Sequence, residues 1–455
     1  MDRKFTVVDL VGVVLVVFVF TQSVYGLVNL LSVPLVHLRE PNLVEADPAD
    51  APDRVVRVLI PAVDEDRAVV TETLQSLYDA DYPSDLIYVY LVYEPDDPTV
   101  TEYVDDLVTL QRDLGRDVTA VQVDRRTLAT HIDSGPSLLP PERTPETKAS
   151  ALVYAFTTLT FNPDDVVTVF DADTTAPPDL LPLAVAGLET YDFVQAKQTV
   201  RNVFEGALPF LEAMGIAAWC DTIYERSSRG PYQLLGKAYF TSARTLHDLG
   251  GWQADAVTED MTLGLAASAR GYRLGIVDRY VYDLCPAEIG AWLRQKRRWA
   301  RGPYGHLFDS GFDRGGRLRL WTYTVANQIV SVTNLAGLPA GIAMVVLTVV
   351  GLAPPFSAPL AALVAFNLGA WIYYSVQSYR AAWAAVPVES VERWVYMLVS
   401  NPFTQLFYST VWAIPVLVAA ADAVRGRDPE FVVTPKPTGR ERNSESPAAG
   451  TAEDD

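Results

Sequence analysis

Apolar residues are concentrated at the two ends of the chain, and the middle alternates between short apolar runs and helical patterns. Residues 5–31 are almost wholly apolar, and about 20 such residues span a bilayer. No small-residue cleavage site follows a short apolar core, so we expect an uncleaved N-terminal transmembrane anchor. A linker rich in Pro, Asp and Glu follows over residues 32–54.

Residues 55–320 are predicted to form an α/β domain, because short apolar runs alternate with helical spacing of apolar residues. The expected elements are strand 55–61, helix 71–80, strand 86–92, helix 104–114, strand 118–123, helix 149–160 and a strand from Val166. Alternation at this spacing implies a mostly parallel sheet with right-handed crossovers.

After residue 320 the chain becomes apolar again, and we expect about three transmembrane spans within 321–424. The candidate spans are 322–352, 358–376 and 395–421. Residues 425–455 form a polar tail. Three spans after the domain would leave this tail outside the cell, whereas its basic residues near the membrane favour the inside. The number of spans stays open.

The charge of the chain excludes one class of partner. It has 56 acidic and 36 basic residues and a formal net charge of -20, which argues against a nucleic-acid partner and fits a protein that works in high salt. Cys220 and Cys285 are too few for a disulfide framework and wrongly spaced for a zinc site.

The first candidate site follows the apolar run Val166–Phe170. Asp171 and Asp173 come directly after it, at the end of a strand where open α/β sheets collect their ligands. Two carboxylates and substrate phosphates are how proteins commonly hold Mg²⁺ or Mn²⁺. The alternative is that Asp173 and Thr174 only cap the next helix.

Two later stretches add chemistry. Thr258, Glu259 and Asp260 precede a helical run, where Thr258 could serve only as an N-cap or the two acids could line a site. Residues 292–301 combine five basic side chains with two Trp. They suit either a basic helix face at a membrane surface or a site for a diphosphate and a sugar ring.

Several motifs occur in one order along residues 55–302: Pro61-Ala62-Val63-Asp64-Glu65, Asp81-Tyr82-Pro83, Lys148-Ala149-Ser150-Ala151-Leu152, Asp171-Ala172-Asp173, Gly250-Gly251-Trp252, Thr258-Glu259-Asp260 and Gln295-x-x-Arg298-Trp299. Together they resemble the family-2 glycosyltransferases of the GT-A fold, especially the membrane-embedded branch. That branch includes cellulose, chitin and hyaluronan synthases and ceramide glucosyltransferase. The chain departs from the family pattern at Asp64 and Val153, where Asn is usual, and at Glu94, where many members have Asp.

The resemblance implies a role for each site residue. It implies Asp260 as general base with Glu259 beside it, and Asp171 and Asp173 as metal ligands. It implies that the nucleotide sugar is bound by Pro61, Glu94, Lys148, Asp171 and Arg298. It implies that the acceptor and the diphosphate are held by Gln295, Arg298 and Trp299. Residues 431–436 resemble the gating loop of cellulose synthase, with Phe431, Thr434 and Lys436 as its matching positions.

The resemblance also implies a reaction. We expect an inverting transfer of sugar from a nucleotide-diphosphate sugar, expected to be a UDP-sugar, with Mg²⁺ or Mn²⁺. The acceptor would be membrane-associated, and the enzyme a multi-pass protein of the cell membrane with a cytoplasmic catalytic domain. Three outcomes stay open: processive polysaccharide synthesis, addition of one sugar to a lipid or polyprenyl phosphate, and a non-catalytic membrane scaffold.

Overall fold

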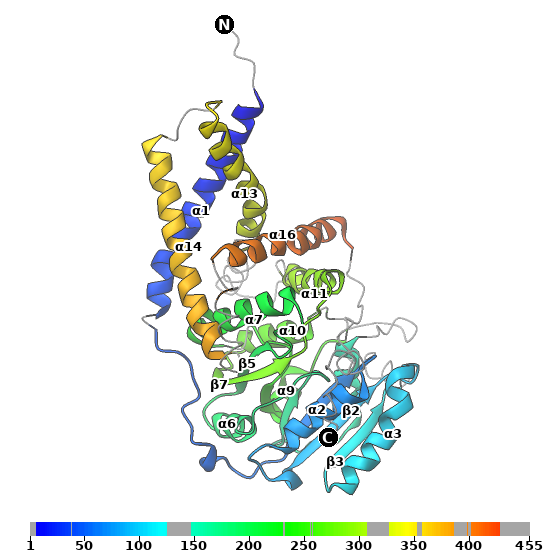
Figure 1. The fold of residues 1–455 in the computed structure, drawn as a ribbon. Coiled ribbons are helices and arrows are strands. Elements are labelled where there is room, and N and C mark those ends of the chain that lie inside the picture. Colours follow the sequence, from blue (N-terminus) through cyan, green and yellow to red (C-terminus); the bar gives the residue numbers. More distant parts are fainter. Residues whose placement is uncertain are drawn as a thin grey trace, which may run out of the picture.

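The structure, a computed structural model, places an α/β body at one end and a group of long helices at the other (Figure 1). It describes residues 6–37, 39–124, 147–230, 233–254, 256, 258–306, 327–352, 357–385, 398 and 402–427. The possible gating residues Phe431, Thr434 and Lys436 lie outside these ranges.

One mixed, mostly parallel sheet forms the centre of the body. Within the described ranges it has seven strands in the order β3-β2-β1-β4-β6-β5-β7. The strands are β1 (Val56–Ala62), β2 (Ile87–Tyr93), β3 (Asp117–Gln122), β4 (Val166–Val169), β5 (Phe193–Val200), β6 (Tyr239–Ser242) and β7 (Leu274–Asp283). Only β6 runs antiparallel to its neighbours, β4 and β5. The predicted α/β class with a mostly parallel sheet is confirmed.

Helices cover both faces of the sheet and enclose two apolar clusters. The helices of the body are α2 (Arg67–Tyr78), α3 (Pro98–Asp113), α5 (Lys148–Thr158), α6 (Leu180–Gly187), α7 (Ala207–Trp219), α8 (Glu225–Ser227), α9 (Ala243–Leu249), α10 (Glu259–Ala269) and α11 (Ile289–Arg301). Helices α2 and α3 begin four to six residues before the predicted starts at 71 and 104. Asp66 and Asp97 explain the difference, because each side chain accepts a hydrogen bond from the first turn and so fixes the N-terminus.

The apolar ends of the chain form long helices, α1 (Val7–His37), α13 (Asn327–Val349), α14 (Ala358–Ala385) and α16 (Pro402–Arg425). In the portion of the chain that the structure covers, none of these helices has the length and hydropathy needed to cross a bilayer. The predicted spans at 5–31, 322–352, 358–376 and 395–421 therefore have no support from these helices.

The third candidate C-terminal span is placed differently from the prediction. Helix α16 lies across α11 on the body (Figure 1). Its residues Ala413, Val416 and Ala419 are buried, and Asp422 pairs with Arg297 of α11. One face of α16 therefore packs against protein, while Phe407, Ile414, Leu417 and Val418 are exposed.

Candidate active site

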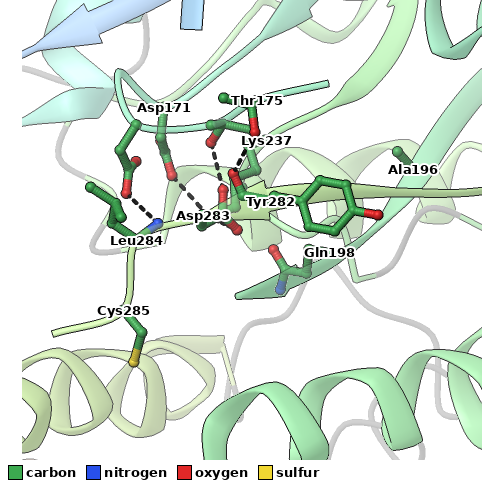
Figure 2. A network of polar contacts seen from close by, with 12 residues as sticks. Asp171, Thr175, Ala196, Gln198, Lys237, Tyr282, Asp283, Leu284 and Cys285 are labelled. Atoms are coloured by element: carbon green, nitrogen blue, oxygen red, sulfur yellow. Dashed lines mark hydrogen bonds and ion pairs between the residues drawn. The ribbon is translucent and has the colours of Figure 1, made fainter. Parts of the chain in front are cut away.

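The predicted acids gather at one edge of the sheet. Asp171 and Asp173 follow the carboxyl end of β4, and Asp283 is the last residue of β7. Lys237 precedes β6 and reaches the same place, so that Asp171, Lys237 and Asp283 lie together (Figure 2). The carboxyl edge of the sheet therefore holds the candidate site, as expected for an open α/β fold.

Asp171 is held by two lysines. Its Oδ1 lies 2.5 Å from Lys148 Nζ and its Oδ2 lies 3.2 Å from Lys237 Nζ. Burial alone would lower the pKa of each lysine. The nearby carboxylates, chiefly Asp171 for Lys148 and Asp283 for Lys237, have the larger combined effect, so the pKa of each lysine is raised. Both ammonium groups therefore stay charged at neutral pH.

The segment after β4 is pinned to the end of β7. The Leu284 N–H donates to Asp173 Oδ2 at 3.0 Å, and the Thr174 hydroxyl donates to Asp283 Oδ1 at 2.6 Å. The next helix, α6, begins after Asp179 rather than after Asp173 or Thr174. The alternative that Asp173 and Thr174 cap that helix is therefore wrong.

Asp171 and Asp173 can bind a hard cation if a substrate supplies further oxygen ligands. Within the described part of the chain, no group of three or more Asp, Glu, His or Cys side chains is arranged to hold a metal ion. Asp171 and Asp173 supply carboxylate oxygens, the donors that Mg²⁺ and Mn²⁺ prefer, and phosphate oxygens commonly complete such sites. The two residues fit a cation that is shared with a diphosphate.

Glu259 and Asp260 start α10 and join the same cluster. Lys148 Nζ lies 3.4 Å from Glu259 Oε1, so one lysine contacts both acidic motifs. The Thr258 side chain makes no capping hydrogen bond, and it packs instead against Gly302, where a Cβ would lie 2.5 Å from Thr258 Cγ2. Thr258 therefore occupies the predicted N-cap position of α10, but its side chain does not cap the helix.

The environment of Asp260 suits a proton acceptor. Burial, with the charge of Glu259 beside it, raises the pKa of Asp260 to about 7, while Lys148 and Arg298 act in the opposite direction. A group with this pKa exchanges a proton readily near neutral pH. Gly236 permits the loop before β6 to approach, because a Cβ there would lie 3.2 Å from Asp260 Oδ2.

Helix α11 carries Gln295, Arg298 and Trp299, all partly buried. Arg298 is close enough to Asp260 for its charge to lower the pKa of that acid. The ring centre of Trp299 lies 3.4 Å from Lys296 Nζ, so a buried cation covers one face of the ring. The basic segment therefore faces inward as well as outward, and it is not only a solvated face.

A buried ionic cluster fixes α11 to its neighbours. Lys296 pairs with Glu212 of α7, and the two side chains are 1% and 2% exposed. Glu212 also accepts from the Trp292 indole N–H at 3.0 Å and from the Tyr408 hydroxyl of α16. This cluster joins α7, α11 and α16 around the residue next to Gln295.

The remaining predicted residues lie along the same edge of the sheet. Pro61 is in β1 beside Val92 of β2, and Glu94 follows β2 and is buried. Asp64 has φ of 51°, a left-handed conformation that Asn and Asp tolerate best, which explains why Asp can stand where Asn is usual. The structure places these residues at the carboxyl edge of the sheet, where the acids lie. Their contact with a nucleotide stays a prediction.

Two residues of the cluster were missed by sequence reasoning, Lys237 and Asp283. Neither lies in a motif that resembles the family, and Lys237 is 66 residues from Asp171 along the chain. One sequence feature could have indicated Lys237. It is a lysine between Gly236 and Ala238, in a chain where lysine is rare.

The family comparison agrees with this geometry. The family described as glycosyl transferase family group 2 matches residues 166–419, more than half of the chain, from β4 through most of α16. The chain belongs to this family. The predicted membership of the family-2 glycosyltransferases is confirmed.

Two curated proteins are similar to this chain over part of their length. A beta-monoglucosyldiacylglycerol synthase of Synechocystis sp. is 25% identical over 59% of this chain and 52% of its own length. Glucomannan 4-beta-mannosyltransferase 2 of Arabidopsis thaliana is 26% identical over 59% of this chain and 48% of its own length. The matches thus span about half the length of these curated relatives.

A solved structure supports the fold. A mannosyltransferase from Pyrobaculum calidifontis, in complex with GDP-Man and Mn²⁺, superposes with a TM-score of 0.54 at 18% identity. The superposition covers 90% of this chain and 100% of that one. The sheet and its helices therefore follow the GT-A arrangement expected for family 2.

The buried Glu212–Lys296 pair should contribute to the free energy of unfolding, and a substitution can test this. Glu212→Gln keeps the size of the side chain but leaves the ammonium of Lys296 without its counter-charge. Removing one partner of a buried pair typically costs about 3–5 kcal/mol. We expect the free energy of unfolding to fall by about that amount in urea titrations. Asp164→Asn, at an exposed position, should leave it unchanged, and an equally small effect of both changes would contradict the assignment.

Proposed function

We propose that this chain transfers a sugar, with inversion, from a nucleotide-diphosphate sugar to a hydroxyl of a membrane-associated acceptor. The observation that supports this best is the position of Lys148. It contacts Asp171 at 2.5 Å and Glu259 at 3.4 Å, so the acids expected to serve the donor and those expected to serve the acceptor line one site. Membership of a glycosyltransferase family and retention of these acids favour catalysis over a non-catalytic scaffold.

At the donor side, the chain has to stabilise a leaving diphosphate. Asp171 and Asp173 would hold Mg²⁺ or Mn²⁺, whose charge offsets the negative charge that grows on the leaving group. Arg298 would add a guanidinium against the same phosphates, a charge-assisted contact that needs no proton transfer. Pro61, Glu94 and Lys148 would bind the rest of the nucleotide sugar at the carboxyl ends of β1 and β2 and the start of α5.

At the acceptor side, Asp260 would take the proton from the attacking hydroxyl. General-base help of this kind typically contributes about 10²–10⁴ in rate. Gln295 and Trp299 would position the acceptor on the far side of the sugar from the diphosphate, which gives inversion. Glu259 would keep Lys148 aligned between the two halves of the site.

The donor we propose first is a UDP-sugar. Glu94 stands where many family members have the Asp that contacts uracil, so the same carboxylate function is kept on a longer side chain. GDP-mannose is the second donor to test, since it is the nucleotide sugar bound in the structure with the same fold.

Apolar side chains on the outer helices support a membrane-associated acceptor. Large aliphatic residues are exposed along α1 and α13, and they include Leu10, Val13, Val17, Ile342, Val346 and Val349. Exposed large aliphatic side chains in this number mark a surface that another apolar phase covers, and we propose that this phase is lipid. We propose that these helices contact the cell membrane and that the α/β body lies on the cytoplasmic side, where nucleotide sugars are made.

Two products fit this site. Processive extension of a polysaccharide fits the Gln-x-x-Arg-Trp motif and the glucomannan mannosyltransferases among the relatives. Addition of a single sugar to a lipid fits the relative named as a glycolipid synthase. Both reactions use the same donor chemistry and differ in the acceptor.

The products can be told apart directly. Membranes that contain the chain should release UDP from one UDP-sugar, and sizing of the labelled product should show either a long polymer or a lipid with one sugar. GDP-mannose should be run in parallel. Absence of product with every donor, in membranes where the folded chain is present, would contradict the proposed function.

Asp260→Asn should lower the transfer rate by about 10²–10⁴ while donor and metal binding persist, because only the proton acceptor is lost. Since Asp260 with a pKa of about 7 must be deprotonated to act, the wild-type rate should also fall as the pH drops below about 7. Initial rates across pH 5–9 would show this. Asp164→Asn is the matched control at an exposed site. Near-normal turnover by Asp260→Asn would exclude the base assignment.

Asp173→Ala should weaken Mn²⁺-dependent nucleotide binding by about 100-fold or more. Mutation of a residue that only hydrogen-bonds to a metal ligand typically costs about 10- to 100-fold, and loss of a ligand should cost at least as much. Calorimetry with UDP, with and without Mn²⁺, measures this. Nucleotide binding without metal should change little. Unaltered binding in the presence of Mn²⁺ would show that Asp173 is not a ligand.

A further inference from the structure

Lys237 engages two carboxylates at the donor half of the site. Its Nζ lies 3.2 Å from Asp171 Oδ2 and 2.8 Å from Asp283 Oδ2 (Figure 2). Lys148 engages the other oxygen of Asp171 at 2.5 Å. In the structure, each carboxylate oxygen of this expected metal ligand is therefore in contact with an ammonium group.

The backbone around Lys237 is held independently of its side chain. The Gln195 side chain donates to the Lys237 carbonyl at 2.8 Å, and the Ala238 N–H donates to the Val169 carbonyl at 2.7 Å. Gly236 and Ala238 on either side have φ of 77° and 47°, which is a strained conformation for alanine. The loop thus aims the lysine at the acids, and the side chain can change partners without movement of the loop.

The charges of the site disfavour a metal ion that arrives alone. A divalent cation on Asp171 and Asp173 would place two positive charges beside Lys148 and Lys237, and like charges in a partly buried site repel strongly. A nucleoside diphosphate brings negative charge and phosphate oxygens, which lysine ammonium groups bind well. Diphosphate binding would therefore remove the repulsion and offer Lys237 new acceptors.

We propose that Lys237 is a resident counter-cation that neutralises Asp171 and Asp283 when no donor is bound, and that it moves to the diphosphate when donor and metal bind together. This inference rests on the proposed metal–diphosphate site. It adds that one side chain, Lys237, sets how strongly metal binding depends on the nucleotide.

The test is Mn²⁺ binding to the full chain, followed by electron paramagnetic resonance of free Mn²⁺, alone and with UDP or GDP. The wild type should bind Mn²⁺ weakly alone and more tightly with a diphosphate. Lys237→Gln should bind Mn²⁺ alone about tenfold more tightly, and the gain from the diphosphate should shrink about tenfold, as expected when one nearby positive charge is removed.

Two variants separate this role from a general charge effect. Lys237→Arg keeps the positive charge and should behave like the wild type. Arg244→Gln removes a positive charge at an exposed position and should also behave like the wild type. If Lys237→Gln does not fold, Lys237→Met provides the test, because it removes the same charge from a side chain of similar length and should give the same changes of about tenfold.

The outcomes distinguish this inference from the site on which it rests. No Mn²⁺ binding by the wild type, even with both diphosphates, would overturn the metal site and this inference with it. Normal Mn²⁺–diphosphate binding by the wild type, with Lys237→Gln unchanged in both measurements, would overturn only the role of Lys237. If Lys237→Arg changes Mn²⁺ binding as much as Lys237→Gln does, the positive charge is not the cause, and the proposed role of Lys237 is likewise overturned.

Discussion

The site depends on the neutralisation of acids that the fold crowds together. Asp171, Asp283 and Glu259 come from different elements and meet at one edge of the sheet. Two unit charges at 4 Å interact by about 4 kcal/mol at an effective dielectric constant of 20, a large share of the stability of a domain. Lys148 and Lys237 lie between these acids and offset their mutual repulsion with attractive ion pairs. The same ion pairs therefore stabilise the fold and position the acids of the site.

Local sequence signals were sufficient for the sheet and for the first acids. The alternation of strands and helices predicted β1 to β4 to within a residue or two at most of their ends, because each element buries its own apolar stripe. Asp171 and Asp173 were predictable because they follow a buried strand directly. The early starts of α2 and α3 came from Asp66 and Asp97, capping residues that apolar spacing does not register.

Contacts between distant segments were not predictable in the same way. Lys237 reaches Asp171 across 66 residues, and Lys296 reaches Glu212 across 84. The basic stretch of α11 looked uniform in sequence, yet packing divides it. Lys296 is buried against Trp299, whereas Arg294 is exposed to solvent. Only the tertiary fold decides which of several similar charges becomes part of the site.

Helix α16 lies well beyond the sheet in sequence and still touches the helix that carries Arg298 and Trp299. Arg297 pairs with Asp422, and Tyr408 shares Glu212 with Lys296. The facing surfaces of α11 and α16 are therefore a matched pair, and a change on one constrains what is tolerated on the other. Exchange of the C-terminal segment between relatives would succeed only if the contacting residues of α11 were inherited with it.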